Sequence, residues 1–482
     1  MAASLNRHAL DRHLALAGFM GSGKTTTGRE LAGRLDRRFI DLDDLIEKRA
    51  GVTIADLFAT GGEAAFRELE ERVAHEVLAE GDPAVVALGG GAVLSEKTRA
   101  ELGRRAYTVL LDVDAETAWN RVSTGADRPL AQDPDAFHAL HRDRQPLYEE
   151  VADARAHDVD SAVLAAAGVH VELGAIDVLG ELIPGDAPLE LVADAHVSGI
   201  HGVRAQLALG ARDIGLHEVP AGEPAKSVGV LERLWSSLRI GRDGGLVALG
   251  GGCTTDVVGF AAATHMRGVE WTAVPTSLVG QVDAALGGKT AIDLPGAKNI
   301  VGAFHWPTRV VIDPTLLETL PDEERQNGRA EIVKTGLLLG EPLWELSEVE
   351  QVRRCAIFKS GICLADPHDR GLRNQLNLGH TFAHALEAAA GYDLSHGRAV
   401  ALGLLAALRL TGRDDEIAIV RRVLSPKPVR VDRDAAWAAL NRDKKASRGT
   451  PRLVLLDAPG DVRWGVEVPE AEVRAALDTL IA

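Results

Sequence analysis

The stretch His13-Leu-Ala-Leu-Ala17, followed by Gly18-Phe-Met-Gly-Ser-Gly-Lys-Thr25, decides the fold of the first part of the chain. Its mostly apolar first half predicts a buried strand, and a helix-like pattern follows the loop. The loop matches G-x-x-x-x-G-K-[ST], in which glycines expose backbone N–H groups to a phosphate at a helix N-terminus. In this pattern Lys24 reaches the outer phosphates and the Thr25 hydroxyl binds Mg²⁺. We therefore predict a nucleotide-phosphate site here; a chance glycine-rich turn is the less favoured alternative.

Further short apolar runs continue the pattern of the first strand. The runs Arg38–Asp41, Ala84–Leu88 and Thr108–Val113 alternate with helical segments, which predicts an α/β unit with a parallel sheet. After the Ala-rich stretch 161–167, a second α/β series begins at Val169–Leu173 and ends at Arg309–Ile312. We place domain boundaries after residues 167 and 312.

The last part of the chain, residues 313–482, is predicted to be mainly helical. Its apolar spacing is 3.6-periodic, as in Ala399–Leu410, and a strand pair at Arg452–Leu456 and Val462–Val466 interrupts it. The predicted domains are thus 1–167, 168–312 and 313–482, in agreement with the roughly 150 residues per domain expected of a 482-residue chain.

Composition excludes several classes of function. The 53 Lys and Arg residues are outnumbered by 70 Asp and Glu residues, and the net charge of −17 argues against binding to nucleic acid or an anionic membrane. The longest apolar runs fall short of the ~18 residues that a membrane span needs. Three cysteines form no CxxC pair, and the first residues lack a signal-peptide pattern. We expect a cytoplasmic protein.

Acidic and basic motifs follow the phosphate loop in a fixed order. Carboxylates in Asp41-Leu-Asp43-Asp44 could hold Mg²⁺ and orient a hydroxyl group, although a helix cap is an alternative. The later motifs are Phe66-Arg67-Glu68, Gly89-Gly90-Gly91, Asp127-Arg128-Pro129 and Arg144-Gln-Pro-Leu-Tyr148. In this order and spacing, the first 152 residues resemble the shikimate kinases. The strand and helix after Ala154 look shorter than in that family.

The resemblance implies an ATP-dependent phosphorylation of shikimate. It implies that Asp43 receives the proton of the substrate hydroxyl, that Thr25 and Asp41 hold Mg²⁺, and that Arg128 contacts the transferred phosphate. Planar guanidinium groups bind a carboxylate through two hydrogen bonds, which suits a small acidic substrate. The implied ATP contacts are Gly21, Ser22, Gly23, Lys24, Thr25, Thr26 and Arg128. The implied shikimate contacts are Asp43, Arg67, Gly89, Gly90, Gly91 and Arg144.

Histidines in the last third of the chain predict a metal site. The segment Asn377-Leu-Gly-His380-Thr-Phe-Ala-His384 places two imidazoles on one helix face, and His396 follows a turn. Such a cluster could bind a divalent metal with an open position, with Glu331 as a carboxylate partner; structural histidines are an equally weighted alternative.

A dense series of motifs joins this cluster to the second α/β series. Gly250-Gly-Gly-Cys-Thr-Thr-Asp256 follows a strand and could bind a pyrophosphate. The strings GEPAK, MRGVEW, VDAALGGKT, AKNIVGAFHWP, AEIVK, GLRNQLNLGHTFAHALE, LSHGRAVALG and RDKK occur in this order. From Val169 to about Glu470 the chain is similar to the 3-dehydroquinate synthases.

This second resemblance implies a metal- and NAD-dependent conversion of 3-deoxy-D-arabino-heptulosonate 7-phosphate to 3-dehydroquinate and phosphate. The implied ligands of Zn²⁺ or Co²⁺ are Glu331, His380 and His396. The implied NAD contacts are Asp194, Glu223, Lys226, Gly251, Gly252, Asp256, Thr276, Ser277, Lys289 and Lys298. The implied substrate contacts are Arg267, Asp283, Lys289, Asn299, Lys334, Lys359, Arg373, Asn377, His384 and Lys444 or Lys445, of which Lys289, Lys334, Arg373 and His384 are also expected to be catalytic.

Arg267 is expected to reach the site of a neighbouring subunit, so a homodimer follows from the resemblance. Two features depart from it: Asp369 stands where a Glu is common, and the spacing from Glu331 to Lys359 is short.

Two other functions compete with this interpretation. One is a metal-dependent polyol or alcohol dehydrogenase, and the other is a regulatory protein that has lost one activity.

The expected architecture combines three parts. An N-terminal P-loop kinase domain, with a parallel sheet and flanking helices, precedes an α/β nucleotide-binding domain and a mainly α-helical metal-binding domain.

Overall fold

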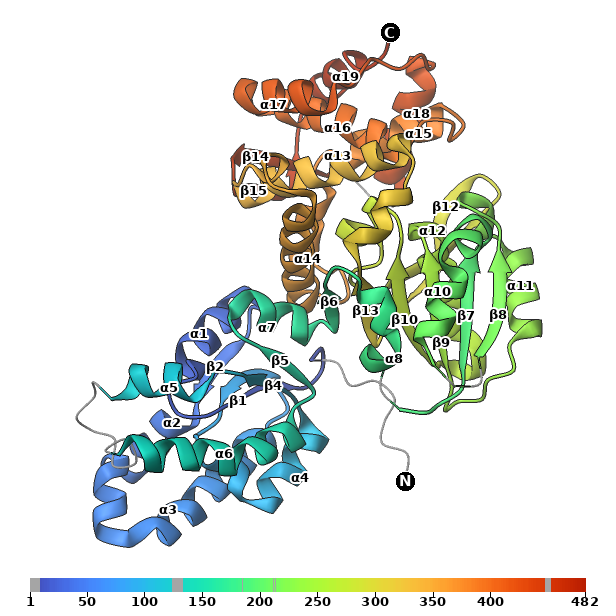
Figure 1. Cartoon of the computed structure of the whole chain (residues 1–482). Helices are drawn as coiled ribbons and strands as arrows, with labels where there is room; N and C mark the ends of the chain where they lie inside the picture. The colour runs from blue at the N-terminus through green and yellow to red at the C-terminus, as the bar shows by residue number, and fades with distance from the viewer. Residues whose placement is uncertain (1–8, 124–132, 184, 211, 213, 447–451) are drawn as a thin grey trace. The chain divides into compact units, whose positions relative to one another are not determined.

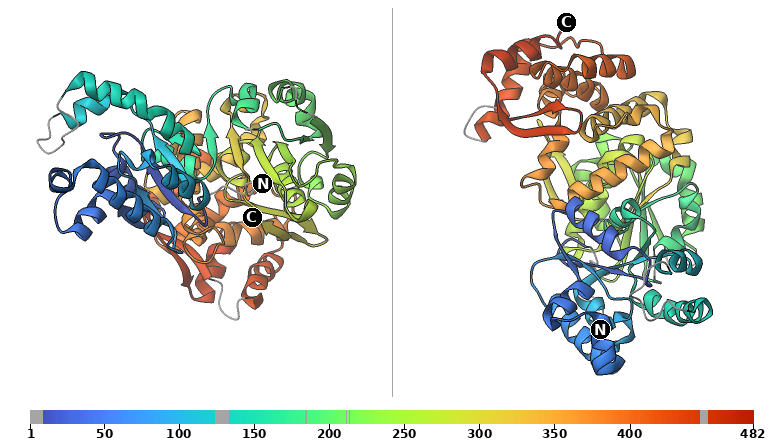
Figure 2. Two further views of the ribbon diagram at one scale, coloured as in Figure 1. Left: turned by 90° about the horizontal axis from the view of Figure 1, so that it is seen from below. Right: turned by 90° about the vertical axis from the view of Figure 1, so that its left-hand side faces the viewer.

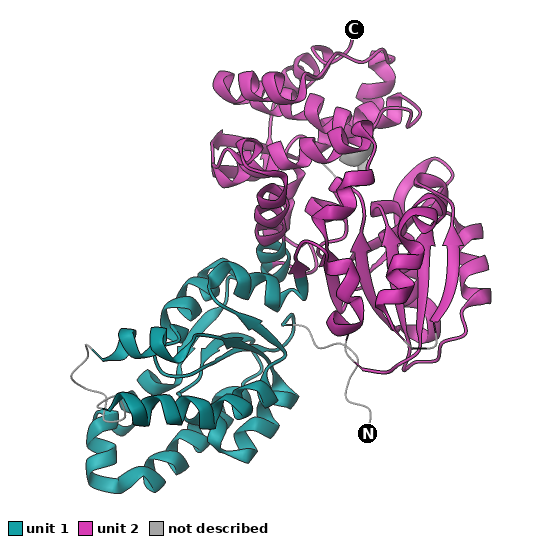
Figure 3. Cartoon of the chain, viewed as in Figure 1, with its two compact units in different colours: residues 1–169, 360–365 teal, residues 170–359, 366–482 magenta. Residues whose placement is uncertain are grey.

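The computed structural model describes residues 9–123, 133–183, 185–210, 212, 214–446 and 452–482, except for the side chains of residues 442–446. The chain forms two compact units (Figure 3). The N-terminal unit comprises residues 1–169 and 360–365, and the C-terminal unit comprises residues 170–359 and 366–482. None of the described helices combines the length and the apolar character that crossing a membrane requires. The predicted boundaries after residues 167 and 312 stay predictions.

The N-terminal unit is built on a five-stranded parallel sheet, with the strand order β2-β3-β1-β4-β5. Figure 1 labels β1, β2, β4 and β5 of this sheet. All five residues of the central strand β1 (His13–Ala17) are buried, as expected for a parallel strand that is covered on both faces. The chain leaves β1 toward β2 and later returns to β4 on its other side. The carboxyl end of β1 therefore lies where the strand order reverses, which is where open α/β sheets bind ligands.

The remaining elements of this unit alternate along the chain as the sequence predicts. They are α1 (Lys24–Arg34), β2 (Arg38–Asp41), α2 (Leu42–Ala50), α3 (Ile54–Leu78), β3 (Ala84–Ala87), η1 (Ala92–Leu94), α4 (Glu96–Arg105), β4 (Ala106–Leu111), α5 (Ala115–Val122), α6 (Pro134–Val151), β5 (Ala154–Ala156) and α7 (Val159–Ala166).

The core of the N-terminal unit lies between the sheet and its helices. Phe66 of α3, Leu110 of β4 and Phe137 of α6 are buried in it. The rings of Phe19 and Phe137 meet edge-to-face with centroids 4.9 Å apart, an arrangement that aromatic pairs prefer. This packing holds α6 against the loop that follows β1.

The C-terminal unit contains a six-stranded sheet with the order β6-β13-β10-β9-β7-β8. From β7 (Leu189–Asp194) the chain moves outward to β8, and then it returns to β9 (Gly245–Gly250) on the other side of β7. The strand order thus reverses between β7 and β9, which marks the expected ligand crevice at their carboxyl ends.

Short helices and an antiparallel strand pair connect the strands of this sheet. The elements of this part are β6 (Val169–Val171), η2 (Ala175–Val178), α8 (Leu179–Leu182), α9 (Ala195–Val197), η3 (Ser198–Gly202), α10 (Val203–Ala208), β8 (Ile214–Val219), η4 (Glu223–Ala225), α11 (Val228–Ser237), α12 (Gly252–Thr264), η5 (His265–Arg267), β10 (Glu270–Pro275), η6 (Gly280–Ala284), the antiparallel pair β11 (Lys289–Leu294) and β12 (Ala297–Phe304), β13 (Arg309–Ile312) and η7 (Pro314–Thr319).

Helices dominate the rest of the C-terminal unit (Figures 1 and 2). Helix α16 (His396–Leu410) is buried along most of its length. The backbone of α16 approaches the start of α15 so closely that a Cβ at Gly403 would lie 2.1 Å from the Gly379 carbonyl oxygen. The other elements are α13 (Asp322–Leu339), η8 (Leu343–Glu345), α14 (Glu348–Ala365), η9 (Leu372–Asn377), α15 (His380–Ala389), α17 (Asp414–Leu424), α18 (Arg433–Ala446), the hairpin β14 (Arg452–Ala458) and β15 (Asp461–Glu467), and α19 (Glu470–Asp478). Residues 360–365 of α14 belong to the N-terminal unit.

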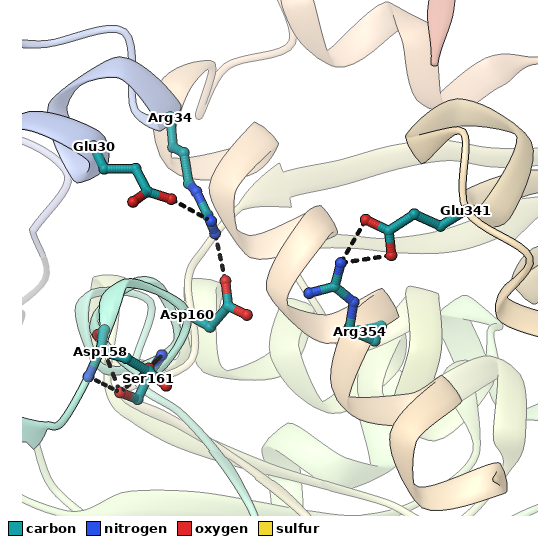
Figure 4. Close-up of polar contacts among 7 residues, drawn as sticks. All are labelled: Glu30, Arg34, Asp158, Asp160, Ser161, Glu341 and Arg354. Atoms are coloured by element: carbon teal, nitrogen blue, oxygen red, sulfur yellow. Dashed lines mark hydrogen bonds and ion pairs between the residues drawn. The ribbon is translucent and has the colours of Figure 1, made fainter. Parts of the chain in front are cut away.

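Polar contacts fix the ends of helices in both units (Figure 4). In the N-terminal unit, Arg34 at the end of α1 lies 2.5 Å from an Asp160 carboxylate oxygen. The Asp158 carboxylate accepts the Ser161 N–H at 2.7 Å and caps α7. In the C-terminal unit, one Arg354 nitrogen lies 2.6 Å from both carboxylate oxygens of Glu341. Each exposed ion pair contributes ~1 kcal/mol or less, so these contacts mainly define local geometry.

Candidate functional sites

The loop after β1 has the backbone conformation of a phosphate cradle. Gly18, Gly21 and Gly23 have φ of 150°, 82° and 89°, which favours glycine at each position. Helix α1 begins directly after Gly23, so its N-terminal N–H groups face the loop. The Lys24 ammonium group donates to the carbonyl oxygens of Gly18 and Phe19, at 2.7 and 3.0 Å. The predicted contacts Gly21, Ser22, Gly23, Lys24, Thr25 and Thr26 therefore lie on one turn and the start of one helix.

A hydroxyl group and a carboxylate meet beside this loop. The Thr25 hydroxyl donates to Asp41 Oδ2 at 2.6 Å, and Asp41 ends strand β2. Oxygen donors of this kind are those that Mg²⁺ prefers, so the pair fits the predicted metal. The Asp41 carboxylate also accepts the Asp43 N–H at 3.0 Å and caps α2. The sequence offers a helix cap and a metal ligand as alternatives here, and the Asp41 side chain can serve as both.

The turn Gly89–Gly91 after β3 lies among the predicted shikimate contacts. A Cβ at Gly89 would lie 2.7 Å from Asp43 Oδ1, and a Cβ at Gly91 would lie 1.9 Å from Arg67 Nη1. Only glycine leaves room for these side chains. Arg144, which is buried on α6, donates from Nη1 to the Gly90 carbonyl oxygen at 2.9 Å. The structure therefore brings Asp43, Arg67, Gly89–Gly91 and Arg144 together, whereas Arg128 lies outside the described residues.

Three further residues contact this group or the phosphate loop and were not predicted as site residues. Glu70, 3% exposed, lies 2.7 Å from Arg67 Nη1; its own pKa is raised by burial, against the opposing effect of Arg67. Tyr148 donates to the Gly90 carbonyl oxygen, and Arg121 donates to the Gly21 carbonyl oxygen at 3.1 Å. Glu70 follows Arg67, and Tyr148 follows Arg144, by about one helical turn. Each therefore lies on the same helix face as its arginine, and this spacing could have identified both residues once the arginines were known.

Glu331, His380 and His396 form a group that can hold a metal ion. They come from α13, α15 and α16, and their ligand atoms all lie within 4.8 Å of one another. Glu331 Oε1 is 3.6 Å from His380 Nε2 and 3.1 Å from His396 Nε2. Two imidazoles and one carboxylate are the protein ligands of one class of catalytic Zn²⁺ sites. The donor set therefore fits the predicted metal.

The protonation of these side chains follows from burial and mutual contact. Burial, with Lys334 nearby, lowers the pKa of His380 to about 3. At His396 burial acts in the same direction, but the hydrogen bonds to Glu331 and Glu387 prevail and raise the pKa to about 10. Although burial opposes ionisation of Glu331, Lys334 and the imidazoles hold its pKa well below the usual range.

Glu387 was not predicted; it lies 3.1 Å from His396 Nδ1. A carboxylate on the second imidazole nitrogen orients a metal-binding histidine.

The second glycine turn lies at the ligand crevice of the six-stranded sheet. Gly250 ends β9, and α12 begins at Gly252. A Cβ at Gly252 would lie 2.8 Å from Ala284 Cβ, so close packing requires the glycine. Asp194 ends the adjacent strand β7 and caps α9. Gly251, Thr276 and Ser277 border the same turn: the Thr276 N–H donates to the Gly250 carbonyl oxygen at 2.9 Å, and a Cβ at Gly251 would lie 3.2 Å from Ser277 Oγ.

Charged side chains form ion pairs near this turn, and among them Lys226 is buried. Lys226 Nζ is 2.7 Å from Asp256 Oδ2 and also donates to Asn299 Oδ1. Burial raises the pKa of Asp256 to about 6, against the opposing effect of Lys226. Lys298 Nζ is 3.3 Å from Glu223 Oε1 and 4.8 Å from the centre of the Tyr392 ring. Asn299, predicted as a substrate contact, is thus placed among predicted NAD contacts, and Tyr392 was not predicted at all.

Four of the predicted substrate cations have carboxylate or carbonyl partners among the described residues. Lys359 Nζ is 2.7 Å from Asp283 Oδ1, Lys334 pairs with Glu331, and Lys289 pairs with Asp369. The last pair gives Asp369 a partner that was not predicted. Arg373 Nη1 donates to the Gly287 carbonyl oxygen at 2.9 Å.

The remaining predicted substrate contacts are placed unevenly. Asn377 ends η9 shortly before His380, and the His384 ring lies 5.6 Å from the His380 ring. Arg267 is exposed, with φ of 68°, beside Gly268 with φ of 120°. The side chains of Lys444 and Lys445 lie outside the described residues.

Three family models match successive parts of the chain. Residues 20–171 match the shikimate kinase model, residues 216–327 the 3-dehydroquinate synthase N-terminal model, and residues 328–446 the 3-dehydroquinate synthase C-terminal model.

Two curated relatives and one solved structure extend these matches. The bifunctional shikimate kinase/3-dehydroquinate synthase of Thermotoga maritima is 32% identical over 502 residues, covering 96% of this chain and 99% of its own. The 3-dehydroquinate synthase of Symbiobacterium thermophilum is 36% identical, covering 66% of this chain and 97% of its own. The 2-epi-5-epi-valiolone synthase from Streptomyces hygroscopicus subsp. jinggangensis 5008, solved with NAD⁺ and Zn²⁺ bound, has a TM-score of 0.57 at 27% identity, covering 65% of this chain and 96% of its own.

Proposed function

This chain belongs to the shikimate kinase and 3-dehydroquinate synthase families, joined in one polypeptide, and from this premise we propose which residues carry each reaction. The enzyme phosphorylates shikimate with ATP, and it converts 3-deoxy-D-arabino-heptulosonate 7-phosphate to 3-dehydroquinate and phosphate. The first reaction is assigned to the N-terminal unit, here called the kinase unit. The second is assigned to the C-terminal unit, here called the synthase unit.

In the kinase unit, the loop Gly18–Thr25 and Lys24 hold the phosphates of ATP, with Mg²⁺ at Thr25 and Asp41. The oxygen–phosphorus bond to shikimate forms while the bond from the γ-phosphorus to ADP breaks, and Asp43 takes the hydroxyl proton. Arg67 and Arg144 bind the shikimate carboxylate beside Gly89–Gly91. The observation that carries this assignment is the convergence of Asp43 and both arginines on one glycine turn.

In the synthase unit, Glu331, His380 and His396 would hold Zn²⁺ or Co²⁺, and the β7–β9 crevice would hold NAD. When bound, the metal polarises a substrate oxygen, and NAD⁺ accepts a hydride and returns it. The protein places cations around the leaving phosphate: Lys289, Lys334, Lys359 and Arg373. The convergence of the three ligand atoms within 4.8 Å carries this assignment.

We further propose that the enzyme is a cytoplasmic homodimer formed through the synthase unit. The left-handed backbone at Arg267, on an exposed turn, presents this guanidinium outward and supports its expected reach into a partner subunit. Sedimentation of the purified chain tests the dimer. Complementation between an Arg267→Ala chain and a chain inactivated at His380 tests the shared site.

Two assays test the proposed reactions. The kinase assignment requires ADP formation that depends on shikimate. The synthase assignment requires phosphate release without net NADH, together with loss of activity on metal removal and recovery with Zn²⁺ or Co²⁺. Net NADH formation from a simple alcohol would instead favour a dehydrogenase.

A further inference from the structure

The Gly90 carbonyl oxygen accepts two hydrogen bonds from one face of α6. The Tyr148 hydroxyl donates at 2.6 Å, and Arg144 Nη1 donates at 2.9 Å. The two donors are four residues apart, so they lie on the same side of the helix. Both side chains are buried, with exposed fractions of 1% for Tyr148 and 5% for Arg144.

The orientation of this carbonyl sets the orientation of the next N–H group. A trans peptide is planar, so the Gly90 carbonyl and the Gly91 N–H point in opposite directions. Because the carbonyl points toward α6, the Gly91 N–H points away from α6. In the part of the chain that the structure describes, no acceptor is recorded for this N–H group.

Glycine on both sides of this peptide makes it easy to rotate. Neither Gly90 nor Gly91 has a Cβ that would resist a change of φ or ψ. The carbonyls of Gly89 and Gly91 are held by the N–H groups of Ala92 and Leu94, at 3.1 and 2.9 Å. The orientation of the central peptide depends on the two donors of α6.

We propose that Tyr148 is a positioning residue of the kinase reaction, which locks the Gly90–Gly91 peptide so that the Gly91 N–H faces the acidic substrate. This inference rests on the proposed function, because it assigns a role to the glycine turn that binds shikimate there. Tyr148 acts through the turn and does not itself touch the substrate. Arg144 shares this positioning role through its own hydrogen bond to the Gly90 carbonyl oxygen.

The phenol remains a donor throughout the working pH range. Burial raises the pKa of Tyr148 to about 12, so the hydroxyl keeps its proton at neutral pH. Replacement by Phe removes the oxygen and keeps the ring, which is packed in the core of the unit.

The test compares Tyr148→Phe with Tyr107→Phe in the full chain. Tyr107 is also buried and also donates to a backbone carbonyl, that of Ala165, at 2.9 Å, but it lies on β4 and outside the proposed site. Loss of one well-placed donor is worth about tenfold in binding. For Tyr148→Phe we expect KM for shikimate to rise about tenfold, while KM for ATP, kcat and synthase activity stay within about twofold. Tyr107→Phe leaves all of these constants unchanged.

Three results would overturn the proposal. The first is an unchanged KM for shikimate in Tyr148→Phe. The second is an equal rise in both variants. The third is a Tyr148→Phe kinase unit that loses ATP affinity or fails to fold, because the phenol would then serve stability alone. Failure of the proposed function is a different result: the unaltered chain would form no ADP with shikimate.

Discussion

At the scale of single residues, Lys24 holds the phosphate loop of the kinase unit together. Its ammonium group donates to the carbonyl oxygens of Gly18 and Phe19, and we propose that the same charge binds the phosphates of ATP. We expect Lys24→Ala to lower kcat/KM of the kinase by about 10²- to 10³-fold, the usual effect of removing one charge-stabilising donor. Synthase activity stays unchanged.

Lys97→Ala is the matched control for this variant, because Lys97 is an exposed lysine of the same unit that pairs with Glu71. Steady-state assays of both reactions give the comparison. A kinase that tolerates Lys24→Ala as well as Lys97→Ala contradicts the assigned role.

His380 plays the corresponding part in the synthase unit. Removing one of the three proposed ligands leaves a buried carboxylate and a single imidazole, which is a poor set for Zn²⁺. We expect His380→Ala to lower bound metal and to reduce synthase activity by about 100-fold or more, since even outer partners of metal ligands are worth 10–100-fold. Kinase activity is unaffected.

His201→Ala controls for the loss of a buried imidazole. His201 is also buried, and its Nε2 lies 3.0 Å from Thr319 Oγ1, in the same unit and outside the metal group. Metal content by elemental analysis separates the two roles. Equal metal loss in both variants would argue against the ligand assignment.

At the scale of elements, the turn Gly89–Gly91 needs its glycines for access. A Cβ at Gly91 would displace the Arg67 guanidinium. Because a flexible side chain can move aside, the fold survives, but the substrate loses this contact. We expect Gly91→Ala to raise KM for shikimate about tenfold or more, with KM for ATP unchanged.

Gly103→Ala is the control, because nothing lies within 4 Å of a Cβ at this position inside α4. Alanine in an exposed helix adds up to ~1 kcal/mol of stability. The KM for shikimate and the melting temperature of both variants show whether Gly91 serves substrate binding or stability. If Gly91→Ala loses stability rather than shikimate affinity, the turn is structural.

The start of the central strand carries a pH-sensitive contact. His13 Nδ1 accepts the Ala84 N–H at 3.2 Å, and Nε2 lies 3.1 Å from the Glu80 carbonyl oxygen, so the ring bonds as a neutral imidazole. Burial lowers the pKa of His13 below 6.5. When the pH falls below the pKa of the unfolded chain, His13 is protonated in the unfolded chain but stays neutral in the folded chain. The free energy of unfolding therefore falls as the pH falls.

We expect the apparent melting temperature of the kinase unit to drop between pH 7 and pH 5, and to drop less in His13→Gln, whose amide does not titrate. The apparent melting temperature of each chain is measured by the loss of kinase activity on heating. If the melting temperatures of the two chains fall equally between pH 7 and pH 5, His13 is not the source of the pH dependence.

Most elements and motif residues of these sites follow from sequence, because their signals are local. Strands β1, β2 and β13 were predicted with their observed bounds, since each is a short apolar run between polar turns. The prediction for β4 was shifted: the strand is Ala106–Leu111 rather than 108–113, because its register is set by the pairing of Ala106 with His13 on β1. Such pairing joins distant residues and leaves no local pattern.

The same limit applies to the sites. Lys24, Asp43 and the histidines stand in recognisable motifs. Tyr148 contacts a carbonyl 58 residues away, and its role appears only when α6 is placed beside the glycine turn. The partner residues of catalytic groups are therefore the ones that sequence reasoning misses.

At the scale of the whole molecule, the chain combines two sites that do not depend on a common residue. The phosphate loop and the glycine turn lie in the kinase unit, and the metal group and the β7–β9 crevice lie in the synthase unit. The two reactions are not consecutive in the shikimate pathway, so the shared polypeptide does not imply direct transfer of an intermediate. We propose instead that it supplies both activities in equal amounts.

The measurement that tests this account most directly is a paired assay on one preparation of the purified chain. Shikimate-dependent ADP formation and phosphate release from the heptulosonate phosphate are followed before and after a zinc-selective chelator, in excess Mg²⁺. We predict that the untreated chain performs both reactions and that the chelator abolishes phosphate release alone, with recovery on adding Zn²⁺ or Co²⁺. Absence of either activity in the untreated chain, or loss of both with the chelator, would contradict two independent sites.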